Sequence, residues 1–225
     1  MIRGILDMNK KNKFWDLHDA IIFFICLIPI FIALIYYKDL PDSMAIHFGP
    51  SGEADNYQSK SMFLVILVLT NLGVSLLVKF SRFIDPRKQN YSKFMRAFLK
   101  TRYIIAVLLG GIGTATIYFN LGYAIDIKLI VLIGVGAVFI GLGNYMGQLR
   151  SNFFIGIRTP WTLSSEENWR KTHRLAGPLF MLCGVLFMIC GFLPGEIAFK
   201  VMLGIIFLLA LFTYGYSYYL FKKGI

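Results

Sequence analysis

The chain has 225 residues, of which 57% are hydrophobic and 16% are charged, and it carries a formal net charge of +11. Its mean hydropathy of +0.65 lies well outside the range of soluble globular domains and excludes that class. These values predict an integral membrane protein.

Six apolar runs are long enough to cross a hydrocarbon core of about 30 Å, for which a helix needs roughly 20 residues. In lipid a helix satisfies its own backbone hydrogen bonds, so we expect each run to be helical. The predicted fold is an all-α, six-helix transmembrane bundle. In chain order the runs are Ala20–Tyr37, Met62–Phe80, Ile104–Phe119, Leu129–Gly147, Pro178–Pro194 and Ile197–Leu220.

Four cations precede the first run, as in a secretory signal, but the run is long and has no small-residue cleavage site. We therefore interpret it as an uncleaved membrane anchor. The four cations are Arg3, Lys10, Lys11 and Lys13.

The loop between the first two runs is rich in proline and glycine, which predicts a compact, turn-rich loop with a short extended piece at Met44–Phe48. His47, Glu53 and Asp55 are the types of residue that bind metals or act as acids and bases, but their spacing matches no known ligand pattern. The simpler interpretation is that Asp and Gly form turns, while His47 and Lys60 lie at the lipid headgroups.

The six runs contain no Asp, Glu, His or Arg, so we expect none of these residues near the bilayer centre. This argues against a coupled transporter, in which such residues carry ions, protons or substrates. Small residues spaced by four in the fourth run predict that another helix approaches it closely. These pairs are Ala137 with Gly141 and Gly143 with Gly147.

The loop between the fourth and fifth runs, residues 148–177, is polar and aromatic. It holds five cations and two of the three tryptophans of the chain. Ser164 and Glu167 have the spacing of a capping box, which predicts a short interfacial helix near residues 165–175. We expect glycine and proline to end this helix and to redirect the chain into the fifth run.

This loop allows two interpretations. It either anchors itself at the lipid surface or forms a docking face for a cytoplasmic partner. Arg158 is expected to hold the turn by bonding backbone carbonyls or Glu166. The docking face would consist of Arg158, Trp161, Glu166, Trp169, Arg170, Lys171 and His173.

The distribution of lysine and arginine predicts the orientation of the chain. With the N-terminus inside, 19 of the 23 cations fall on the inner side of the membrane. The positive-inside rule therefore predicts that both termini are cytoplasmic. Such cations set the topology and contact anionic lipid, and this explains the positive net charge. We therefore expect no direct nucleic-acid binding. The four outer cations are Lys38, Lys60, Lys128 and Lys200.

Three stretches resemble a known family. The stretch "NYMGQLRSNFFIGIRTPWTLSSEENWRKTHRLAGPLF" resembles the signature of the SdpI-like (SdpI/YfhL) family of bacterial membrane immunity proteins. The stretch "LPDSMAIHFGPSGEADNYQSK" resembles the DUF1648 module often found with that family, and "IDPRKQNYSKF" resembles its second loop.

The resemblance implies two modules. Residues 1–80 would form a DUF1648-like module with two spans and the outer loop 38–61. Residues 81–225 would form an SdpI-like module with four spans and the cytoplasmic loop 148–177. In the outer loop, the resemblance assigns ligand sensing to His47, Gly52, Asp55 and Lys60.

The family resemblance also implies a function. The implied protein spans the bacterial cell membrane several times and protects its host from a secreted toxic peptide. Some members also capture a cytoplasmic transcriptional repressor at the membrane when toxin is present. The expected partners are the lipid bilayer, the toxic peptide and such a repressor.

No catalytic residue, cofactor or metal site is predicted. The three histidines lie at membrane boundaries, and the strings HExxH and GxSxG do not occur. A transporter of a small molecule or peptide, and an intramembrane enzyme, remain the alternatives.

Overall fold

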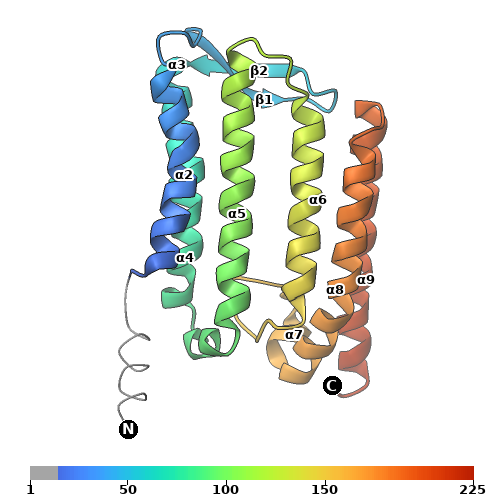
Figure 1. Ribbon diagram of the computed structural model, residues 1–225. Helices are drawn as coiled ribbons and strands as arrows, with labels where there is room; N and C mark the ends of the chain where they lie inside the picture. Colours follow the sequence, from blue (N-terminus) through green and yellow to red (C-terminus); the bar gives the residue numbers. More distant parts are fainter. Residues whose placement is uncertain (1–14) are drawn as a thin grey trace.

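The computed structural model describes residues 15–225, and within them six helical segments are long and apolar enough to cross a membrane (Figure 1). The predicted six-helix fold is confirmed. The four cations expected before the first span lie outside the described residues. The spans are α2 (Leu17–Ile35), the continuous segment α3 (Lys60–Val68), η1 (Leu69–Gly73) and α4 (Val74–Ile84), then α5 (Tyr91–Asn120), α6 (Ile127–Met146), α8 (Glu166–Cys190) and α9 (Gly195–Lys222).

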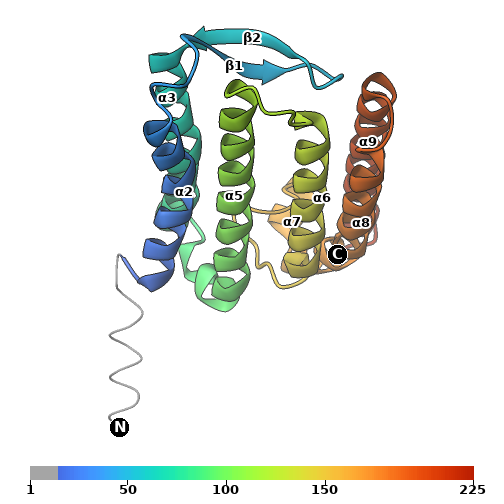
Figure 2. The same cartoon turned by 45° about the horizontal axis from the view of Figure 1, so that its top comes forward.

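Short elements lie at the two ends of this bundle. At one end, strands β1 (Ser43–Phe48) and β2 (Ala54–Ser59) form a hairpin that lies across the helix ends (Figure 2). The opposite end holds the start of α2, the turn η2 (Lys88–Asn90), the helix α7 (Pro160–Ser164) and the C-terminus (Figure 1). We call these two ends the hairpin end and the loop end.

The hairpin confirms the extended piece expected at Met44–Phe48 and adds an antiparallel partner strand, in which Met44 pairs with Gln58. Met44 and Ala45 are fully buried against the bundle. The side chain of Asn120 fixes the strand on α5, because it accepts a bond from Ala45 N at 2.7 Å and donates one to Ala45 O at 3.1 Å. The hairpin is therefore part of the folded bundle.

Helices α6 and α8 approach each other closely through glycines. A Cβ at Gly143 would lie 2.6 Å from the carbonyl oxygen of Gly177, and one at Gly136 would lie 2.6 Å from that of Gly184. Gly143 thus has the role expected of the small residues in the fourth span. Gly141 is also closely packed, because a Cβ there would lie 2.7 Å from Ile104 Cδ1 of α5, whereas a Cβ at Gly147 would have no atom within 4 Å. The close contact with α8 recurs every seven residues, at Gly136 and Gly143, rather than every four.

Helix α8 differs from the expected short interfacial helix. Its N-cap is Ser165 rather than Ser164, and the Ser165 side chain accepts a bond from Asn168 N at 3.2 Å. The helix continues through Pro178 to Cys190 without a break. A proline inside a transmembrane helix is tolerated when neighbouring helices support the backbone, and here Gly177 packs directly on α6.

Candidate functional site

The hairpin brings three of the four predicted ligand-sensing residues together. His47 Nδ1 lies 2.5 Å from Asp55 Oδ1, and the two side chains are 66% and 52% exposed. Gly52 turns the hairpin with a φ of +87°, and a Cβ there would lie 3.0 Å from Lys128 Cβ on α6. Glycine is needed at this position for both its conformation and its size.

Lys60, the fourth predicted residue, lies at the base of the hairpin. Its ammonium group donates to the carbonyl oxygen of Tyr37 at 3.0 Å and lies 3.7 Å from Asp42. It thereby ties the end of α2 to the start of α3, away from His47 and Asp55.

A cavity of about 380 Å³ lies beside His47 and Asp55, between the hairpin, α6 and α9. Its polar side chains are His47 and Asp55 of the hairpin and Lys128 of α6. Its apolar walls come from Val131 and Leu132 of α6 and from Phe199 of α9. The site therefore combines residues of the N-terminal hairpin with residues of two later spans.

At the loop end, side-chain bonds to the backbone hold the irregular segment between α6 and α7. Asn152 accepts bonds from the amides of Phe154 and Ile155 at 2.9 Å and 2.7 Å. Asp85 accepts a bond from Phe153 N at 2.9 Å, and Arg87 donates to Leu163 O at 2.7 Å. The linker after α4 thus shapes the loop before α8.

Two residues of the predicted docking face lie inside the fold. Trp169 is 1% exposed, and its indole donates to Leu149 O at 3.0 Å. The buried His173 ring stacks on Trp169, with 4.0 Å between ring centroids. Its Nε2 accepts from Ile157 N at 3.0 Å, and its Nδ1 donates to the Trp169 carbonyl at 2.8 Å. This pairing requires the neutral ring and fastens the loop to α8.

The remaining residues of the predicted docking face lie nearer the surface. Arg158 is exposed and donates to Phe153 O at 2.6 Å, which is the carbonyl bond expected for it. Glu166 and Arg170 are exposed, and Lys171 pairs with Glu167 at 2.9 Å. Trp161 packs at 4.9 Å, centroid to centroid, on both Tyr214 and Tyr218 of α9.

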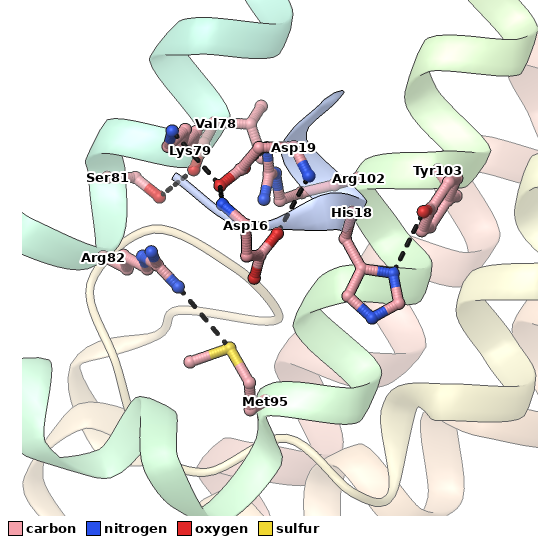
Figure 3. A network of polar contacts seen from close by, with 10 residues as sticks. All are labelled: Asp16, His18, Asp19, Val78, Lys79, Ser81, Arg82, Met95, Arg102 and Tyr103. Carbon is pink, nitrogen blue, oxygen red and sulfur yellow. Dashed lines mark hydrogen bonds and ion pairs between the residues drawn. The ribbon is translucent and has the colours of Figure 1, made fainter. Parts of the chain in front are cut away.

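A buried charge cluster joins α2, α4 and α5 near the loop end (Figure 3). Asp19 accepts a bond from Arg102 Nη2 at 2.7 Å, and Lys79 Nζ lies 3.3 Å from its other oxygen. The three side chains are 1% to 3% exposed. Lys79 also lies 3.3 Å from the centre of the Trp15 ring.

The sequence predicts no Asp, Glu, His or Arg near the bilayer centre, and this cluster lies instead near the loop end, where it adds buried ionisable groups that the sequence did not indicate. The first and third helices begin before the corresponding apolar runs, since α2 begins at Leu17 and α5 already at Tyr91. The apolar pattern alone therefore places Asp19 and Arg102 outside the spans. Across residues 15–225, no group of three or more His, Cys, Asp or Glu side chains is placed to hold a metal ion.

The six spans and the structured segments at both ends define a multi-pass helical membrane protein. Residues 148–217 match the SdpI/YfhL protein family, and residues 24–72 match a domain of unknown function, DUF1648. The resemblance seen in the sequence is therefore confirmed, since a stretch similar to DUF1648 precedes a stretch similar to the SdpI/YfhL family.

One relative is similar over nearly the whole length. The chain is 28% identical over 191 residues to "Immunity protein SdpI" of Bacillus subtilis (strain 168), which covers 85% of this chain and 89% of that protein. No solved structure matches the chain significantly.

Proposed function

We propose that this chain is a membrane immunity protein that protects the cell producing it from a secreted toxic peptide. The observation that carries the proposal is the similarity to "Immunity protein SdpI" over 85% of the chain. A multi-pass bundle with structured segments at both ends supports it, because protection from a secreted peptide requires a surface exposed outside the membrane.

The proposal includes an orientation in the bacterial cell membrane. The hairpin end faces outward, and the loop end and both termini face the cytoplasm. The distribution of charge supports this, since 15 of the 19 lysines and arginines in residues 15–225 fall on the loop-end side of the spans. Residues 1–80 and 81–225 are proposed as two modules, and each contains one of the matched family regions.

A finer part of the proposal assigns separate tasks to the two ends. The hairpin end, through His47, Gly52 and Asp55, senses the peptide, and Lys60 supports the hairpin. The loop end captures a soluble transcriptional repressor through its exposed charged residues. Those residues are Arg158, Glu166 and Arg170, which are exposed, and Lys171, which is partly exposed.

The buried charge cluster favours a second candidate, a transporter, because ionisable groups inside membrane helices often carry ions or protons. Its geometry also fits a structural role, since Asp19 contacts cations from two other helices. Ion-dependent uptake or export by proteoliposomes would support the transporter.

The immunity proposal is tested by producing the protein in a bacterium that a secreted peptide kills. Cells with the protein should survive a peptide dose that kills cells with an empty vector. An unrelated six-span membrane protein, produced at the same level, should give no protection. Equal killing of all three strains, with the protein present in the membrane, would overturn the proposal.

A further inference from the structure

The cavity at the hairpin end points to the class of ligand, an inference that rests on the proposed immunity function. We propose that this cavity binds a positively charged, apolar peptide segment. An apolar side chain of the peptide enters the cavity, and cationic groups of the peptide lie at the rim beside Asp55.

The cavity has the size and position of a ligand site. Its volume of about 380 Å³ falls in the range of about 300 to 1,000 Å³ that is common for binding pockets. It is closed on one side where the hairpin turn meets α9, because a Cβ at Gly195 would overlap the carbonyl of Pro50. The two parts of the chain therefore meet closely at the edge of the cavity.

The inner walls of the cavity are apolar. Val131 and Leu132 come from α6, and Ala198, Phe199 and Met202 come from α9. Such walls favour an aliphatic or aromatic side chain, and methionine adapts to guests of different shape. The cavity itself therefore selects an apolar group.

The rim selects the charge of the ligand. The segments at the hairpin end carry six acidic residues against four lysines, although the whole chain has a net charge of +11. Lys128, at the cavity wall, donates its ammonium to the carbonyl of Leu193 at 2.9 Å. The exposed Asp55 carboxylate also lines the cavity, so a cationic ligand is attracted and an anionic one is repelled.

The test measures peptide binding to the whole protein in nanodiscs of zwitterionic phosphatidylcholine. The probes are a fluorescent peptide of leucine and lysine and a matched peptide of leucine and glutamate. The leucine–lysine peptide should bind, and the leucine–glutamate peptide should bind at least about tenfold more weakly. Equal binding of both peptides would overturn the charge selection and indicate a site for any apolar chain, lipid tails included.

Two variants locate the bound peptide. Val131→Phe fills the cavity and should weaken binding about tenfold. Its matched control is Val138→Phe on the same helix, which fills a different cavity of about 340 Å³ between α5 and α6 and should bind like the wild type.

Asp55→Asn keeps the shape of the cavity and should weaken binding by roughly twofold to fivefold, as expected for an exposed ion pair. Asp39→Asn, at the same end of the bundle, is its control and should have no effect. Because Asp55→Asn changes no packing, it decides the proposal even if Val131→Phe fails to fold. Wild-type affinity in Asp55→Asn, or in folded Val131→Phe, would overturn it.

Survival assays separate this inference from the immunity function. If the wild type protects cells and Val131→Phe and Asp55→Asn protect equally well at normal membrane levels, the function stands and the cavity assignment is wrong. If the wild type gives no protection but binds the leucine–lysine peptide in a Val131-dependent way, the immunity function is wrong and the cavity assignment stands.

Discussion

Replacing Asp19 with asparagine tests the buried charge cluster. The change removes the carboxylate that Arg102 contacts at 2.7 Å and Lys79 at 3.3 Å, in a site where all three side chains are almost fully buried. Removing one partner of a buried ion pair typically costs about 3–5 kcal/mol, because the remaining charge stays buried without compensation. We expect Asp19→Asn to lower the melting temperature in detergent by roughly 6 to 20 °C.

The matched control is Glu167→Gln, which breaks the exposed pair with Lys171, where the side chains are 52% and 38% exposed. Exposed pairs contribute about 0.2–1 kcal/mol, so this variant should melt within about 4 °C of the wild type. Melting of purified protein is followed by the loss of helical circular dichroism. If Asp19→Asn and Glu167→Gln melt at the same temperature, the cluster does not hold the three helices together.

Three further outcomes follow from the packing, the surface charges and the orientation. Gly143→Ala should lose about 1–3 kcal/mol of stability, because its new Cβ would overlap a carbonyl of α8. The control Gly147→Ala should be neutral or slightly stabilising, because no atom lies within 4 Å of its new Cβ. Equal thermal stability of the two variants would refute the close approach of α6 and α8. Replacing Arg170 and Lys171 with alanine should leave protection intact but reduce co-purification of a repressor with membranes, and equal loss of both activities at normal protein level would contradict the separation of tasks. A reporter active only in the cytoplasm should work at the C-terminus and fail at Ser51, and the reverse result would invert the proposed orientation.

The spans could be predicted from the sequence because each apolar run, folded as a helix, has nearly the length needed to cross the bilayer core. The extended piece at β1 could also be predicted, but its partner could not. The sequence of β2, "ADNYQS", has no alternation of apolar residues, and nearly all of it is exposed. It pairs with β1 through its backbone, and the side-chain pattern does not predict this pairing.

The buried residues of the loop end and the charge cluster depend on contacts between distant segments. Trp169 and His173 are residue types that are common at membrane interfaces. They are buried here because the segment before α7 folds over them. Asp19 and Arg102 are 83 residues apart in the chain, and each lies just outside an apolar run. Local patterns identify the residue types at these positions but do not show which residues meet in the fold.

Protection is measured most directly as the lethal concentration of the purified toxic peptide for sensitive cells with and without this protein. The lethal concentration should rise in cells that produce it, and mass spectrometry should recover the peptide with its mass unchanged, because protection without hydrolysis is what an immunity protein provides. An unchanged lethal concentration, with normal amounts of the protein in the membrane, would contradict the immunity function. A raised lethal concentration accompanied by peptide fragments would instead identify an enzyme.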